Sequence, residues 1–153
     1  MERFVSGFLR AALLWLVAGT SLGAAMAIHP AWVVYRPAHL HMLLLGFVTM
    51  MIAGVAYHVL PRFTAVPLHA PRVAMVHLLI ANAGLVALVA GFAVRIGWPE
   101  RGAALLAIGG TGSAVGAWLL AWNLWRTLDG AVPPPGRLPR TSGLPLARSA
   151  PHG

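Results

Sequence analysis

One stretch decides the fold: residues 38–60 read AHLHMLLLGFVTMMIAGVAYHVL and are apolar almost from end to end. A helix needs about 20 such residues to cross the hydrocarbon core of a bilayer. Three further segments have the same length and character, at residues 8–28, 73–96 and 103–126. The sequence therefore predicts an all-α integral membrane protein, with a bundle of four transmembrane helices within residues 1–126.

The composition agrees with a membrane protein and excludes several soluble classes. Hydrophobic residues make up 59% of the 153-residue chain and charged residues only 9%, against about 25% charged residues in soluble domains. Cysteine is absent, which excludes disulfides, thiolate metal sites and iron–sulfur clusters. The chain has only three acidic residues, so hydrolysis by a pair of carboxylates is nearly excluded. The net charge of +8 comes from arginines between apolar segments, which indicates contact with membrane lipid and not with nucleic acid.

The arginines predict which end of the bundle faces the cytoplasm. The N-terminus, the 61–72 loop and the C-terminal tail hold eight of the 11 basic residues, and the other side holds Arg36, Arg95 and Arg101. Cytoplasmic segments carry the excess of basic residues. We therefore expect both termini in the cytoplasm, in a bacterial inner membrane. Residues 127–153 are rich in Pro, Gly and Arg, which predicts an irregular cytoplasmic tail.

Histidines at the helix ends carry most of the functional information. A polar ring in a membrane is costly and usually has a function or a partner, and imidazole is a ligand for haem iron, copper and zinc. His39 and His41 lie at the outer end of the second predicted helix. His58 and His77 lie within one turn of the same depth near the cytoplasmic end. Roughly 25 Å of helix separates His41 from His58, so the sequence predicts two ligand groups, one at each face.

Helical geometry also predicts which way these polar residues face. At 100° per residue, His39 and His41 project about 200° apart and cannot face the same pocket. One of them is expected to ligate, while the other faces an interface or a second partner. Asn82, inside the third apolar segment, is expected to hydrogen-bond another helix or to line the edge of a haem.

The run YRPAHLHMLLLGF at residues 35–47, followed by YHVLPR at residues 57–62, resembles helix two of the haem-copper oxidase catalytic-subunit superfamily. The pattern is similar to that of nitric-oxide reductases and C-family oxidases, and the likeness covers residues 29–95. In those proteins an Arg-x-x-His at the outer end of the helix supplies an axial ligand to a low-spin b-type haem. The resemblance implies that His39 is that ligand. It also matches His41 to the second histidine of the His-x-His pattern in nitric-oxide-response membrane haem proteins.

The number of predicted spans limits what the resemblance implies. A catalytic subunit of that superfamily has twelve spans, and its oxygen- or nitric-oxide-reducing centre uses histidines on later helices. Four spans are predicted here, so we expect this chain not to form a complete oxidase or reductase by itself. His58 and His77 have no assigned counterpart in those large enzymes, and a site there rests on their shared depth alone.

Three functions remain open at this point. The first is a protein with one or two b-type haems, acting in electron transfer or in binding nitric oxide or oxygen. His39 or His41 would hold an outer haem, with Arg36 paired to a propionate, and His58 with His77 would hold an inner one. The second is a copper or zinc protein ligated by histidines, with His58 and His77 joined by His69 or by a solvent ligand. The third is a non-catalytic accessory or assembly subunit of a respiratory complex. A homo-oligomer or a larger respiratory-chain partner would complete any of these sites.

Overall fold

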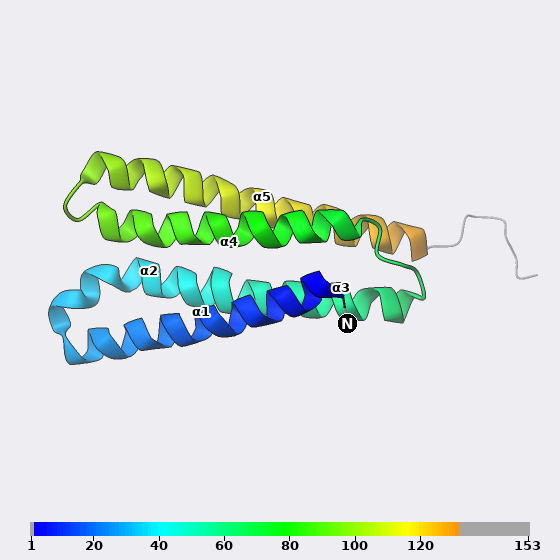
Figure 1. Ribbon diagram of the computed structural model, residues 1–153, viewed down its shortest axis with the longest axis horizontal. Helices are drawn as coiled ribbons and strands as arrows, with labels where there is room; N and C mark the ends of the chain where they lie inside the picture. The colour runs from blue at the N-terminus through cyan, green and yellow to red at the C-terminus, as the bar shows by residue number, and fades with distance from the viewer. Residues whose placement is uncertain (1, 132–153) are drawn as a thin grey trace, which may run out of the picture.

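The computed structural model describes residues 2–131, and these residues form helices joined by short loops, with no strand among them. Four helical rods run side by side, as Figure 1 shows. In chain order they are α1 (Arg3–Ile28), then one continuous rod made of η1 (Pro30–Tyr35), α2 (Arg36–His41), η2 (Met42–Thr49) and α3 (Met50–Thr64), then α4 (Pro71–Val94) and α5 (Pro99–Ala131). The all-α class is therefore confirmed. Each rod is long and apolar enough to cross a membrane, with a mean hydropathy of 1.6 to 2.2 over its most apolar window, so the protein is an integral membrane protein with four candidate spans.

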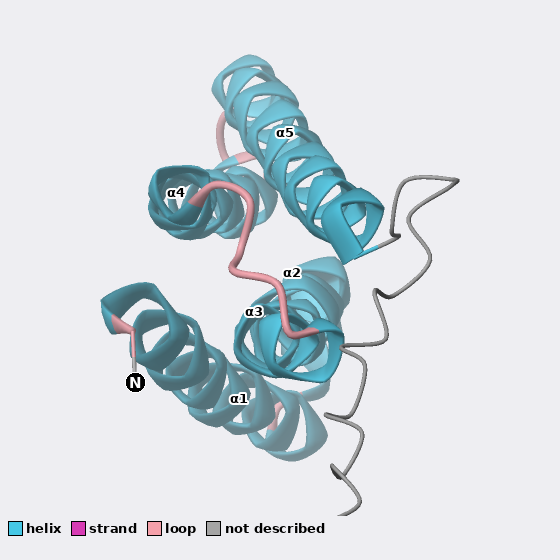
Figure 2. Ribbon diagram, turned by 90° about the vertical axis from the view of Figure 1, so that its right-hand side faces the viewer, coloured by secondary structure: helices cyan, strands magenta, loops and turns pink. Residues whose placement is uncertain are grey.

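The rods form two antiparallel pairs, with α1 beside α2 and α3, and α4 beside α5 (Figure 2). The N-terminus, the loop between α3 and α4 and the end of α5 lie together at one end, which we call the N-terminal end (Figure 1). The η1 turn and the loop between α4 and α5 lie at the opposite end. The bundle thus has the up-and-down topology that the alternation of apolar segments and arginine-bearing loops predicts.

The second rod changes its helical type along its length. It begins as a 3-10 helix of six residues, continues as an α-helix of six residues, and becomes a π-helix over Met42–Thr49 before α3 begins. Within the π segment the Thr49 hydroxyl donates a hydrogen bond to the Leu44 carbonyl oxygen, 2.8 Å away and five residues earlier. Segments of π-helix are frequent at functional sites, and this one follows His41 directly.

Glycines bring α4 and α5 close together. A Cβ at Gly84 would lie 2.8 Å from the Ser113 backbone nitrogen, and a Cβ at Gly109 would meet the backbone of Leu88. Real Cβ atoms essentially never approach this closely, so these positions accept only glycine. Gly112 continues the contact, its missing Cβ lying 3.1 Å from the Gly84 Cα. Close backbone approach through small residues is the usual way for membrane helices to associate.

The last turns of α5 extend beyond the span that the sequence predicts. Residues 127–131, predicted as the start of the tail, are helical. The reason is that the loop before α4 docks on this part of α5: the His69 backbone N–H donates to the Thr127 hydroxyl at 3.1 Å, and Ala70 pairs with Asn123. The remainder of the predicted tail, from residue 132, lies outside the described residues.

Candidate functional site

His39 projects from α2 onto the surface of α1. Its Nδ1 lies 2.8 Å from the Gly19 carbonyl oxygen. A carbonyl oxygen can only accept a hydrogen bond, so Nδ1 donates, and in the neutral ring the lone pair is then on Nε2. The ring lies against Gly23, where a Cβ would come within 2.8 Å of its Cε1. The α1 helix therefore fixes both the orientation and the tautomer of His39.

His41 faces the other side of α2 and meets α4. Its Nδ1 lies 2.7 Å from the carbonyl oxygen of Pro37, one turn earlier, so the same reasoning leaves the lone pair on Nε2. Its ring packs against Phe92 of α4, with the ring centroids 5.1 Å apart. His39 and His41 thus contact different helices, which confirms the prediction that they do not face one pocket.

A cavity lies beside His41, between the start of the second rod and the end of α4. Its volume is about 320 Å³, and it is lined by Val34, Pro37, Phe92, Arg95 and Ile96. Two of these residues, Pro37 and Phe92, are also the contacts of the His41 ring. Arg95 is the charged residue of the lining, and its side chain is exposed.

The arginine that the sequence singled out lies elsewhere. Arg36 is exposed at the start of α2, and it is not a wall of the cavity beside His41. Among the described residues the one ion pair joins Arg126 to Asp129 at 3.7 Å. Arg36 therefore has no carboxylate partner in this part of the chain.

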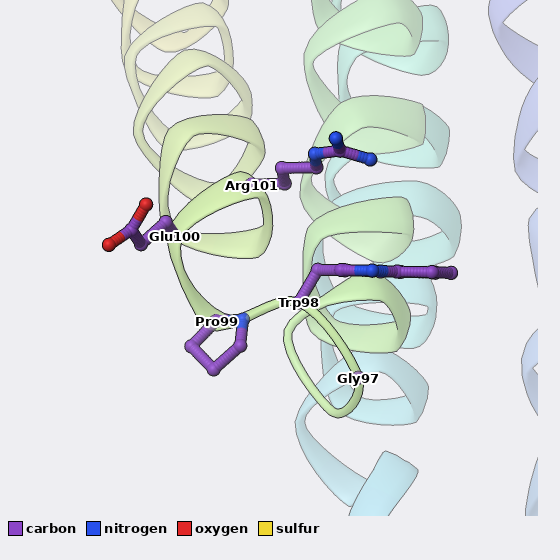
Figure 3. Close-up of a pocket in the computed structure, with 5 residues that line it drawn as sticks. All are labelled: Gly97, Trp98, Pro99, Glu100 and Arg101. Carbon is purple, nitrogen blue, oxygen red and sulfur yellow. The ribbon is translucent and has the colours of Figure 1, made fainter.

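A second hollow lies at the loop between α4 and α5, with a volume of about 340 Å³ and a lining of Gly97 to Arg101. Trp98 and Arg101 extend toward the same side, and Glu100 points the other way (Figure 3). No histidine lines this hollow. It is thus separate from the predicted ligands.

At the N-terminal end the His58 side chain is hydrogen-bonded by Arg62, one turn later on α3. Nη1 of Arg62 lies 3.0 Å from Nδ1 of His58 and also donates to the His58 carbonyl oxygen. A guanidinium can only donate, so Nδ1 of His58 accepts, and Nε2 of the neutral ring carries the hydrogen. His58 therefore has its lone pair occupied, unlike His39 and His41.

His77 is buried in the core of the N-terminal end, with 2% of its surface exposed. Its Nδ1 lies 3.1 Å from the hydroxyl of Tyr57 on α3, and its ring centroid lies 4.7 Å from that of Phe8 on α1. No hydrogen bond or ring contact joins His77 to His58. The structure therefore gives each of the two inner histidines a partner of its own.

Sequence reasoning missed the polar residues that surround this core. Tyr57, Asn123 and Thr127 are each no more than 3% exposed, and all three hydrogen-bond across elements. One sequence signal would have found them: each is a polar residue on the face of its helix that points into the bundle. Of the two expectations for Asn82, the hydrogen bond to another helix is confirmed: its Oδ1 accepts from Trp15 Nε1 of α1 at 3.1 Å.

Comparison with known proteins decides the family. Residues 3–137 match the sequence profile of cytochrome c and quinol oxidase polypeptide I. The chain belongs to this family. The match spans all four rods and every candidate ligand, and it agrees with the resemblance to the haem-copper oxidase catalytic subunit. Members of the oxidase polypeptide I family bind haems and copper. No curated protein matches the chain significantly.

Proposed function

We propose that this member of the oxidase polypeptide I family binds b-type haem through a histidine of α2, at the end of the bundle opposite the N-terminal end. Its function is electron transfer, or the binding of a diatomic gas such as nitric oxide or oxygen. The observation that carries the proposal is the hydrogen bonding of His39 and His41. Each donates from Nδ1 to a backbone carbonyl oxygen, which is how proteins orient an imidazole whose Nε2 ligates a metal.

The set of available donors fits a porphyrin better than a bare copper or zinc ion. Copper and zinc sites in proteins use three or more protein ligands as a rule. In residues 2–131 no three His, Asp or Glu side chains gather closely enough to hold an ion. A porphyrin brings its own equatorial nitrogens, so one or two histidines suffice to hold its iron. This difference favours haem over the copper or zinc alternative.

When bound, the haem would supply the redox and gas-binding chemistry. The chain supplies orientation, basicity and an apolar surrounding. The carbonyl oxygen that accepts the hydrogen bond from Nδ1 holds the ring in place and makes Nε2 a stronger electron-pair donor to a metal. Two axial histidines would favour electron transfer, and one would leave a position for a gas. A second copy of this chain or a larger respiratory-chain partner would be the source of a second axial histidine at this end.

Absorbance spectra of the detergent-purified protein, oxidised and dithionite-reduced, test the proposal together with a pyridine haemochrome assay. We expect a Soret band and the haemochrome of b-type haem. Sharp reduced α and β bands would identify electron transfer, and a high-spin spectrum that shifts with nitric oxide or carbon monoxide would identify gas binding. A colourless protein with bound copper or zinc would contradict haem binding. A colourless, metal-free protein that co-purifies with larger membrane subunits would indicate an accessory role.

Two double variants separate the ends of the bundle. The variant with His39→Ala and His41→Ala should lose the haem of the opposite end, and retention of full haem stoichiometry would contradict the proposal. The variant with His58→Ala and His77→Ala tests for a second haem at the N-terminal end, which we propose to face the cytoplasm. If His58 and His77 hold a second haem, this variant should lose half of the total haem. His69→Ala, in the loop before α4, is the matched control and should leave the haem content unchanged.

A further inference from the structure

We infer that the N-terminal end of the bundle binds the headgroup of a zwitterionic membrane lipid, one that carries a phosphate and an ammonium group, as phosphoethanolamine does. Arg62 and His58 bind the phosphate, and Glu2 binds the ammonium group. The inference does not depend on the proposed function, because the haem proposed above lies at the opposite end. It gives His58 a role other than that of a haem ligand.

A cavity at this end brings together three segments that are distant in the sequence. The start of α1, the last turns of α3 and the loop before α4 form its walls, and Figure 2 looks onto this end of the bundle. Phe4 and Tyr57 pack in one wall with their ring centroids 5.7 Å apart. The loop is held in place because Ala70 pairs with Asn123 of α5. The cavity is therefore built into the fold.

Arg62 and His58 present hydrogen-bond donors to this cavity. Both line it, and both bonds from Arg62 to His58 start at Nη1. Nη2 and Nε of the guanidinium therefore remain for a ligand. Because Nδ1 of His58 accepts from Arg62, Nε2 carries the hydrogen and can donate as well. Two neighbouring side chains with free donors, one of them charged, match the acceptor oxygens of a phosphate group.

Glu2 adds a negative charge to the same cavity. It precedes α1 as the N-cap residue, but its side chain makes no capping hydrogen bond. Within residues 2–131 the one ion pair joins Arg126 to Asp129, so Glu2 and Arg62 line one cavity without pairing. Glu2 repels a simple anion, and Arg62 repels a simple cation. A group that carries both charges is attracted by each of them.

The depth of the cavity selects a lipid as the source of this group. The apolar run of α3 continues to Leu60, and Arg62 follows two residues later, at the level where the hydrocarbon core gives way to the headgroups. Phe4, Val5 and Leu68 make part of the lining apolar, which suits the glycerol end of a lipid. The volume of about 190 Å³ lies below the range for drug-sized ligands, roughly 300 to 1,000 Å³, so it fits a headgroup with the acyl chains outside.

Competition between two lipids with the same acyl chains tests the charge pattern. The full-length protein is purified in detergent, freed of lipid, and mixed with equal amounts of phosphatidylethanolamine and phosphatidylglycerol, which has the phosphate without the ammonium group. Native mass spectrometry counts the lipids that remain bound. Basic residues outnumber acidic ones at this end, so net charge alone favours phosphatidylglycerol. We expect the wild type to prefer phosphatidylethanolamine instead, by about threefold to fivefold.

Single variants assign the two charges. Glu2→Gln should remove the preference, and Glu100→Gln, at an exposed position of the opposite end, is the matched control. Arg62→Gln should weaken both lipids by about tenfold, because the phosphate is common to them. Arg72→Gln, at an exposed position of the same end that does not line the cavity, should leave both unchanged. If circular dichroism shows that Arg62→Gln has lost helicity, His58→Leu takes its place, with an expected loss of about threefold.

Three outcomes would overturn the inference. The first is a wild type that binds the two lipids equally or prefers phosphatidylglycerol. The second is an equal loss in Arg62→Gln and Arg72→Gln, which would mean that general basic charge binds the lipid. The third is displacement of the lipid by an equal concentration of free phosphoethanolamine, which would make a soluble compound the ligand. Haem content, measured by the pyridine haemochrome assay on the same samples, reports on the proposed function separately.

Discussion

The two ends of the bundle use polar residues in opposite ways. At the N-terminal end Tyr57, His77, Asn123 and Thr127 are buried, with 3%, 2%, 0% and 1% of their surface exposed. Each is hydrogen-bonded within the protein, and no buried side-chain nitrogen or oxygen in the described part of the chain lacks a partner. At the opposite end Arg36 and Arg95 are exposed.

The difference shows that the histidines at the two ends of the bundle have different surroundings. The ring of His77 closes a packed core, where leaving it unpaired would cost free energy. The ring of His41 is held by a backbone carbonyl and an aromatic neighbour beside a cavity, and its Nε2 remains available. We therefore propose that the buried polar residues of the N-terminal end stabilise the fold and that haem binding takes place at the opposite end, and the predictions below test that division.

The largest effect on stability is expected at Asn123. Its side chain accepts from the Ala70 N–H and donates to the Ala70 carbonyl oxygen, both at 3.0 Å. Asn123→Leu would leave both backbone groups unpaired, so the free energy of unfolding should fall by about 3 kcal/mol. Thr111→Val, at an exposed position of the same helix, should change it by less than about 0.5 kcal/mol.

Equilibrium unfolding in detergent measures this change, and the haem content of the folded fraction is measured alongside. If the ends are independent, the haem bound per folded protein stays the same. Loss of haem from folded Asn123→Leu, with Thr111→Val unaffected, would break the division between the two ends.

The two tyrosines of the chain allow the same substitution to be compared at both ends of the bundle, with a smaller expected effect than at Asn123. Tyr57→Phe removes the hydroxyl that bonds His77 and should lower the free energy of unfolding by about 1 to 2 kcal/mol. Tyr35→Phe makes the same chemical change at the opposite end, where the side chain is half-buried, and should change it by less than about 0.5 kcal/mol. Equal losses in the two variants, measured by thermal unfolding, would mean that the ends do not differ in this way.

The same contrast explains how far the sequence predicts the structure. Length and hydropathy were enough for the four helices, because a membrane span has to be long and apolar. The opposite facing of His39 and His41 followed from the helical period, because α2 is a regular α-helix over these residues. That Asn82 bonds another helix followed from the cost of an unpaired amide in a membrane, but its partner, Trp15, was not predicted.

The contacts of His58 and His77 were harder to predict, because the direction of a side chain depends on more than its depth in the membrane. The π-helix over Met42–Thr49 has i to i+5 hydrogen bonds, so the 100° period no longer relates His41 to residues of α3. Depth arithmetic brought His58 and His77 to one level, but it is Tyr57 that meets His77. The extension of α5 likewise depends on a loop more than 50 residues earlier in the chain, which no local pattern reveals.

The smallest effect, at Gly23, sharpens the comparison within the opposite end. A Cβ at Gly23 would lie 2.8 Å from Cε1 of His39, so Gly23→Ala has to displace that ring and strain its bond to Gly19. We expect a loss of about 1 kcal/mol in the free energy of unfolding, the lower range for overpacking. Gly110→Ala, where a Cβ meets nothing within 4 Å, should cause no loss. If His41 is the ligand, the absorbance spectrum and the reduction potential of Gly23→Ala remain those of the wild type, because the disturbed ring does not touch the iron. A changed spectrum in Gly23→Ala, with Gly110→Ala unchanged, would place the haem on the α1 side of α2.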